Sequence, residues 1–182
     1  MILSIVSFPA KSLRHPAREV PAAAFGTRLL ADQAEKMLAA CEHYKGIGLA
    51  AQQVGYDLAL AIVPLMIEGK RTLTCVANPQ IVEAGPLIKG EEACLSFGSV
   101  QPLSQPLAPS WVLLRAQSMD GQLIGERVEG YAARAVFHEC EHLAGRLLVD
   151  RVPSPWRKMF LKKVEEVVQV RQHGRAAPPS LR

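Results

Sequence analysis

The sequence predicts an α+β fold in which short, mainly antiparallel strands surround a central helix, with one helix before them and one at the C-terminal end. Two strand-like runs flank Asp120-Gly121, a pair typical of tight turns between antiparallel strands. Helical periodicity is confined to three stretches, and the strand-like runs are grouped between them. A doubly wound parallel sheet would alternate strands with helices, so that architecture is not expected.

The first helix is expected to begin after Thr27, whose side chain can cap it, and to end near Gly46. Strands are expected at residues 58–63 and 72–76, with Asn78-Pro79 as a turn after the second. The first helix has apolar residues at spacings typical of one helical face, namely Leu30, Ala34, Met37, Leu38 and Cys41.

The predicted hairpin pairs residues 111–118 with residues 122–128. The central helix is expected over residues 131–143, until Gly145 ends it. A third helix begins near Pro155 and runs toward Gly174. Its expected apolar face consists of Met159, Phe160, Val164, Val167 and Val168.

The size and composition of the chain fit one globular domain. A chain of 182 residues, 49% of them hydrophobic, can bury a core without disulfides or metal clusters. We therefore expect a single domain over residues 1–182, with 174–182 as a flexible basic tail. The 21% of charged and 5% of aromatic residues exclude a disordered chain, a collagen-like repeat and an aromatic-rich binder of single-stranded nucleic acid.

The central helix carries the strongest chemical signal, His138-Glu139-Cys140-Glu141-His142. Two histidines four residues apart lie on one helical face and can bind one metal ion, while Glu139 can serve as a general base beside it. A catalytic site needs a third protein ligand. Glu165 or Glu166 can supply it as in some metallopeptidases, and Cys94 can supply it as a thiolate.

Gly46 to Gly55 is a stretch rich in glycine and alanine that lets a backbone or a substrate approach closely. Within this stretch, Gln53 follows the run of small residues and offers an amide donor. No Gly-Lys-Ser/Thr follows, so a phosphate-binding loop is not expected.

Taken together, three stretches resemble the motifs of the peptide deformylases: Gly46 to Gln53, Glu92 to Ser96 and His138 to His142. The resemblance implies one divalent metal ion held by Cys94, His138 and His142, with Fe2+ in the cell and Zn2+ or Ni2+ as substitutes. It implies removal of the formyl group from N-formylmethionyl peptides, with Glu139 as the general base. The residues expected at the formyl oxygen and around the substrate are Gln53 and Leu95, and Ile47, Gly48, Ala93, Tyr131 and Ala135.

The chain also departs from the family pattern. Ala93 stands where the family has glycine, Glu141 where bacterial members usually have aspartate, and Phe137 where glutamine is common. After Ser96 the usual proline and substrate-binding arginine are missing, and the next arginine is Arg115. Two alternatives therefore stay open: a deformylase-like protein with weak or altered activity that acts by binding, and a metallopeptidase that uses Glu165 or Glu166.

Four cysteines without CxxC spacing favour a reducing compartment, and the first residues match neither a signal peptide nor a membrane anchor, so we expect a cytoplasmic protein. Residues 154–182 hold seven basic and two acidic side chains, which accounts for the positive charge of the whole chain. With the resemblance, this charge suggests the ribosome as a partner of the C-terminal helix; the alternative is a solvated helix face.

Overall fold

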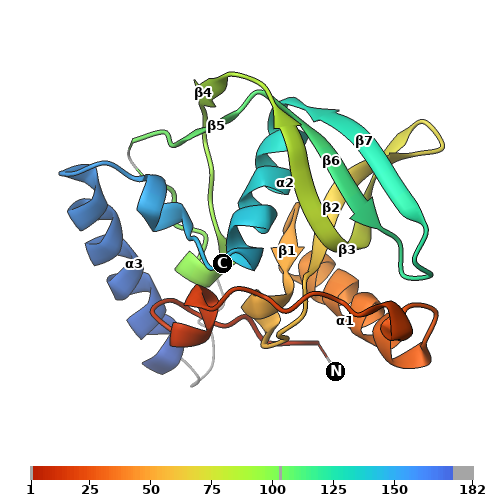
Figure 1. Cartoon of the computed structure of the whole chain (residues 1–182). Coiled ribbons are helices and arrows are strands. Elements are labelled where there is room, and N and C mark those ends of the chain that lie inside the picture. The colour runs from red at the N-terminus through yellow and green to blue at the C-terminus, as the bar shows by residue number, and fades with distance from the viewer. Residues whose placement is uncertain (1, 103, 174–182) are drawn as a thin grey trace, which may run out of the picture.

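The computed structural model describes residues 2–102 and 104–173. This part of the chain contains three α-helices, α1 (Arg28–His43), α2 (Gly130–Leu143) and α3 (Trp156–His173). The central helix α2 lies between the larger sheet and α3 (Figure 1). The predicted fold class and its three helices are confirmed. The basic tail expected at residues 174–182 lies outside the described residues.

The larger sheet is antiparallel and has the strand order β1-β2-β3-β6-β7. Because β6 and β7 pair directly, the predicted hairpin is confirmed. A second, smaller sheet pairs β4 (Leu87–Lys89) with β5 (Leu107–Pro109). The strands of the larger sheet are β1 (Leu49–Ala50), β2 (Leu60–Ile67), β3 (Lys70–Ala84), β6 (Trp111–Gln117) and β7 (Leu123–Glu129).

Strand β3 is longer than expected, because it continues through Asn78-Pro79, where the sequence predicts a turn. Asn78 has a left-handed backbone conformation (φ 51°), and the pairing register shifts between Ala77 and Gln80. The Asn78 side chain accepts a hydrogen bond of 2.8 Å from the N–H of Val20. The bulge thus absorbs the turn-forming residues without ending the strand. Strands β1, β4 and β5 were not predicted from the sequence, because they are too short to have a periodic pattern.

Helices α1 and α2 cover opposite faces of the sheet, because successive side chains of β2 point to opposite sides. Ile62 packs in one cluster with Met37 of α1, whereas Val63 packs in another with Val136 of α2. Thr27 caps α1 as predicted: its hydroxyl accepts a hydrogen bond of 3.3 Å from the N–H of residue 30. The helix with the two histidines is therefore fixed against a rigid sheet.

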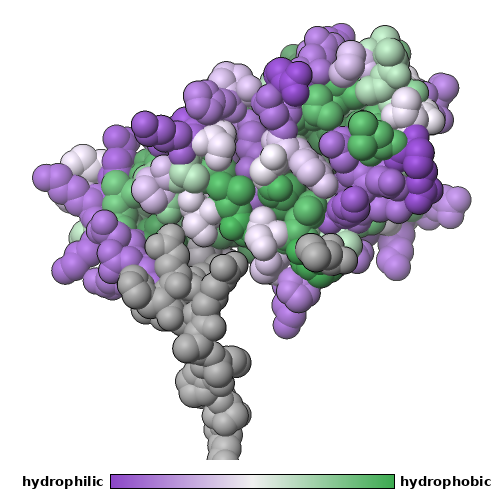
Figure 2. Space-filling view, turned by 90° about the horizontal axis from the view of Figure 1, so that it is seen from below, coloured by the Kyte–Doolittle hydropathy of each residue, from purple (hydrophilic) through white to green (hydrophobic). Residues whose placement is uncertain are grey.

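Helix α3 packs on a separate cluster through Phe160, Val164 and Val168. Met159, expected on the same face, is 52% exposed. The buried residues are four apart and define a narrow stripe, and Met159 lies one residue off it. On the underside of the molecule, hydrophobic residues form a band between more hydrophilic ends (Figure 2). Within residues 2–102 and 104–173, no helix is long and apolar enough to span a lipid bilayer.

Candidate active site

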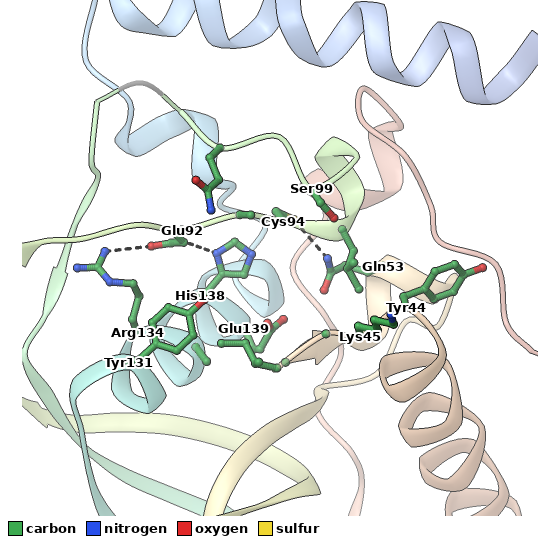
Figure 3. A pocket seen from close by; sticks show the side chains of 17 residues that line it. Tyr44, Lys45, Gln53, Glu92, Cys94, Ser99, Tyr131, Arg134, His138 and Glu139 are labelled. Atoms are coloured by element: carbon green, nitrogen blue, oxygen red, sulfur yellow. Dashed lines mark hydrogen bonds and ion pairs between the residues drawn. The ribbon is translucent and has the colours of Figure 1, made fainter. Parts of the chain in front are cut away.

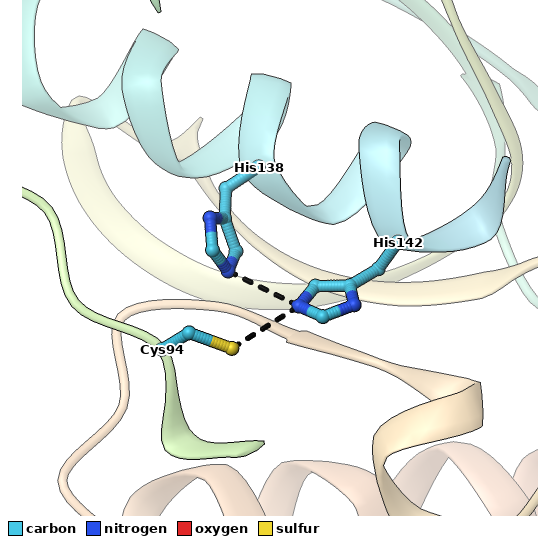
Figure 4. A group of neighbouring side chains, drawn as sticks. All are labelled: Cys94, His138 and His142. Atoms are coloured by element: carbon cyan, nitrogen blue, oxygen red, sulfur yellow. Dashed lines mark hydrogen bonds between the residues drawn. The ribbon is translucent and has the colours of Figure 1, made fainter. Parts of the chain in front are cut away.

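The predicted metal ligands lie together in the structure. Cys94 comes from the extended segment before a short 3-10 turn, and the two histidines project from one face of α2 (Figure 4). The Sγ atom of Cys94 lies 3.2 Å from Nε2 of His142, which in turn lies 3.2 Å from Nε2 of His138. All three side chains are buried, and their ligand atoms lie within 4.8 Å of one another.

These three residues fit a divalent metal ion. Nδ1 of His138 lies 2.6 Å from Oε1 of Glu92. Burial opposes ionisation of Glu92, but contacts with His138 and Arg151 lower its pKa to about 2, so the carboxylate only accepts hydrogen bonds. Nδ1 must then carry the proton, which leaves the lone pair of Nε2 free. Two of the three separations, 3.2 Å each, are close to those of neighbouring ligands about 2.0 to 2.3 Å from a shared ion.

Glu139 lies beside these ligands with one carboxylate oxygen unpartnered. Its side chain is buried, and Oε2 has no hydrogen-bond partner among the described residues. A Cβ atom at Gly48 would overlap with Oε1, so only glycine allows the carboxylate to lie against this backbone. Burial raises the pKa of the Glu139 carboxyl to about 7. A carboxyl group of this kind can both accept and return a proton near neutral pH.

Gln53 and Leu95, the residues expected at the formyl oxygen, flank Cys94. The Gln53 amide accepts a hydrogen bond of 2.8 Å from the N–H of Ala50, which fixes its orientation. Its Nε2 then donates to Sγ of Cys94 at 3.4 Å (Figure 3). The same nitrogen also lies 3.3 Å from Oγ of Ser96, to which it donates. Leu95 begins the 3-10 turn, and N–H groups at the start of a turn have no partner within it.

A cleft of about 300 Å³ opens onto Cys94, His138 and Glu139. It is lined by all five residues predicted to contact the substrate: Ile47, Gly48, Ala93, Tyr131 and Ala135. The structure therefore brings these residues together with the candidate metal ligands. Other lining residues were not predicted from the sequence: Gln101, and Tyr44, Lys45, Ser99 and Arg134 (Figure 3).

A cluster of charged side chains behind the ligands was also missed. The Glu92 carboxylate contacts His138, Arg134 and Arg151. Glu141, one of the departures from the family pattern, is buried and pairs with Arg151 at 2.5 Å. One signal was available in the sequence: Arg134 lies four residues before His138, on the same face of the helix.

The alternative third ligands do not reach this site. Glu165 and Glu166 are exposed on α3, and the metal-binding group found among the described residues contains Cys94 instead. A carboxyl group that can accept a proton thus lies next to ligand atoms suited to a divalent ion, in an accessible cleft. Amide hydrolysis assisted by a metal ion requires this combination, so the fold and the site define the class of metallohydrolases.

Comparison with known proteins narrows the class. The sequence model of the family described as Polypeptide deformylase matches residues 2–158. The peptide deformylase of Azotobacter vinelandii is 36% identical over 176 residues, which are 95% of this chain and 99% of that protein. The chain therefore belongs to the polypeptide deformylase family, hydrolases that remove formyl groups from peptides. The alternative of a metallopeptidase is wrong.

Solved structures lead to the same family. The crystal structure of a peptide deformylase from Legionella pneumophila has a TM-score of 0.85 with this chain at 25% identity, and the match covers 98% of this chain and 100% of the other. That of the peptide deformylase from Thermus thermophilus has a TM-score of 0.81 at 31% identity, with coverage of 95% and 99%. The chain therefore has the fold of the family although residues 93, 137 and 141 depart from its sequence pattern.

Proposed function

We propose that the chain is an active, metal-dependent peptide deformylase, organised as a single domain over residues 1–182, in which Cys94, His138 and His142 hold the ion. The observation that carries this proposal is the convergence of one sulfur and two nitrogen atoms within 4.8 Å, beside Glu139, whose Oε2 has no hydrogen-bond partner among the described residues. The substrate is an N-formylmethionyl peptide. When bound, the ion supplies Lewis-acid chemistry, because it polarises the formyl carbonyl and lowers the pKa of water.

Glu139 acts as the general base and then as the general acid. Its carboxylate takes a proton from the water that attacks the formyl carbon, and later delivers that proton to the leaving amine. A pKa raised to about 7 by burial suits both transfers. Gly48 keeps the carboxylate in place, because the Glu139 side chain fills the space next to its Cα.

Gln53 and Leu95 stabilise the negative charge that develops on the formyl oxygen. The amide of Gln53 points toward Cys94 because its own oxygen is held by the N–H of Ala50. Donors fixed in this way need no reorganisation as the charge develops. The peptide backbone lies near Gly48 and Ala93, and the methionine side chain lies against Ile47, Tyr131 and Ala135.

Fe2+ is the proposed ion in the cell. A thiolate with two imidazoles accepts Fe2+ as well as Zn2+ or Ni2+, so the donor set suits all three. Metal analysis of protein purified without oxygen tests this assignment. Iron as the main metal is expected, and zinc at full occupancy under those conditions would contradict it.

The proposed place of action is the cytoplasm, next to the ribosome. Lys158 and Lys162 are exposed on α3, whose other face packs on the body through Phe160 and Val164. Reversing both charges, together with deletion of residues 174–182, is expected to weaken salt-sensitive co-sedimentation with ribosomes while turnover of small peptides stays unchanged. Co-sedimentation that these changes do not affect would leave α3 as a solvated helix.

The direct test of activity is turnover of formyl-Met-Ala-Ser by iron-loaded protein prepared without oxygen. Release of formate at rates common for enzymes, about 1 per second or faster, is expected. A protein that binds the ion but releases no formate would instead support the alternative of a deformylase-like protein that acts by binding. Unformylated Met-Ala-Ser serves as the control substrate and should remain intact.

A further inference from the structure

Arg134 is a buried cation on the metal-binding helix, one turn before His138. Its side chain is 7% exposed and lines the cleft. Burial of a guanidinium group is costly unless charged and polar partners surround it. The groups that Arg134 contacts therefore indicate its role.

The guanidinium group joins α2 to the segment that forms the opposite wall. Nη1 donates to Oε2 of Glu92 at 3.2 Å and to the carbonyl of Pro106 at 2.9 Å. Nη2 donates to the carbonyl of Ile88 at 2.9 Å. A Cβ atom at Gly90 would lie 2.5 Å from Nη2, so this backbone lies directly against the guanidinium group. One side chain thus fixes three points of the segment that contains Cys94.

The contact with Glu92 leads directly to a proposed metal ligand. Glu92 accepts from Arg134 with one oxygen and from Nδ1 of His138 with the other (Figure 3). Arg134 and His138 lie four residues apart, so the same helical face presents both donors to one carboxylate. Arg151 also contacts Glu92 but does not line the cleft. Rotation of the Glu92 carboxylate would disturb the orientation of the His138 ring.

We propose that Arg134 is a positioning residue for the metal site, which acts through Glu92 on the orientation of His138. It does not touch the ion or the reacting atoms. Its guanidinium group fixes the Glu92 carboxylate, and its bonds to the two carbonyls hold the chain on either side of Cys94. This inference rests on the proposed metal ligands.

The experiment measures the dissociation constants of Zn2+ and Co2+ by competition with a chelator, for the full chain and its variants. Arg134→Met is expected to weaken both by about tenfold or more, as for other residues that orient metal ligands. Arg134→Lys keeps the charge but cannot bond Glu92 and two carbonyls at once, so a loss of about threefold to tenfold is expected. The visible spectrum of the Co2+ protein should change in both variants.

A matched control and a double variant separate positioning from a merely structural role. Arg71 also bonds one carboxylate and one carbonyl, on β3 away from the cleft, so Arg71→Met should leave metal affinity unchanged. In a Glu92→Gln background, Arg134→Met should cost much less affinity than in the parent. The same cost in both backgrounds would overturn a role through Glu92.

Arg134→Lys remains informative even if Arg134→Met fails to fold. Metal affinity and a Co2+ spectrum equal to those of the parent in Arg134→Lys would overturn the proposal. Loss of metal in Cys94→Ala tests the ligands separately. The parent protein could bind the ion through Cys94 while the Arg134 variants bind it equally well. That outcome would refute this inference and leave the proposed function intact.

Discussion

The two walls of the active-site cleft are built in different ways. One wall is α2, a regular helix packed on the sheet, in which a spacing of four residues alone places His138 and His142 side by side. The other wall is the segment of residues 88–102 and 104–109, which carries Cys94 between two very short strands. Two arginines hold its backbone: the buried Arg134 bonds the carbonyls of residues 88 and 106, and the partly buried Arg151 bonds that of residue 107.

The two walls therefore position their residues in different ways. The helix places the proposed ligands and the proposed base by regular backbone geometry, which is more precise than placement by an irregular segment. The facing segment has few regular hydrogen bonds, and its shape depends on individual side chains. Substitutions on the two walls should therefore differ in whether they abolish metal binding, catalysis or only substrate affinity.

The largest effect is expected from Cys94→Ala, which removes the only proposed ligand on the irregular wall. Two histidines alone hold a divalent ion poorly, so metal content and activity should both be lost. Metal analysis after gel filtration measures this, with Glu165→Ala and Glu166→Ala as controls that keep the ion. Full occupancy in Cys94→Ala would show that the two walls do not share a metal.

Glu139→Gln, on the helical wall, is expected to keep the ion and the fold but to lose activity by about a hundredfold or more, because the attacking water has no base. Formate release at saturating substrate, together with metal content, measures this. Glu165→Gln on the exposed face of α3 is the control and should match the parent. Activity of Glu139→Gln within about threefold of the parent would remove Glu139 from the mechanism.

Gly48→Ala tests how closely the helical wall depends on its neighbours. The added methyl group would overlap with the Glu139 carboxylate, so kcat should fall by about tenfold with metal retained. Gly125→Ala is the matched control, because a Cβ atom there meets nothing within 4 Å. Equal kcat values for the two variants would mean that Glu139 tolerates displacement.

Ala93→Gly tests the exposed lining of the irregular wall, and the smallest effect is expected here. If the methyl group crowds the substrate backbone, its removal should lower KM for formyl peptides by about twofold to threefold. Glycine also loosens the segment, so a modest fall in kcat can accompany this. An unchanged KM would identify Ala93 as a neutral replacement for the glycine of the family.

The sequence predicted the helical wall better than the other wall, for a physical reason. Periodicity fixes which helical residues share a face, so the relation of His138 and His142 could be predicted without a structure. Cys94 remained one of several candidates until the order of three motifs was compared with a known family. Nothing periodic connects Arg134 with the carbonyls at residues 88 and 106, because those contacts depend on tertiary packing.

In strand β3, away from the site, tertiary contacts also override a local sequence signal. Asn78-Pro79 is a good local turn signal, but the strand continues through it as a bulge. The Asn78 side chain hydrogen-bonds the N–H of Val20 in the N-terminal segment. Met159 was placed on the buried face of α3 by an apolar pattern that was read too broadly. Local sequence patterns thus gave wrong predictions where tertiary contacts decide whether a strand continues, and where the buried stripe of a helix is narrow.

X-ray absorption spectroscopy of the zinc-loaded protein shows directly whether both walls bind one ion, because it identifies the ligand atoms. One sulfur at about 2.3 Å and two imidazole nitrogens at about 2.0 to 2.1 Å from the Zn2+ ion are expected. The sulfur signal should disappear if Cys94→Ala retains any ion at high zinc concentration. Nitrogen and oxygen ligands alone in the parent protein would show that Cys94 does not bind the ion.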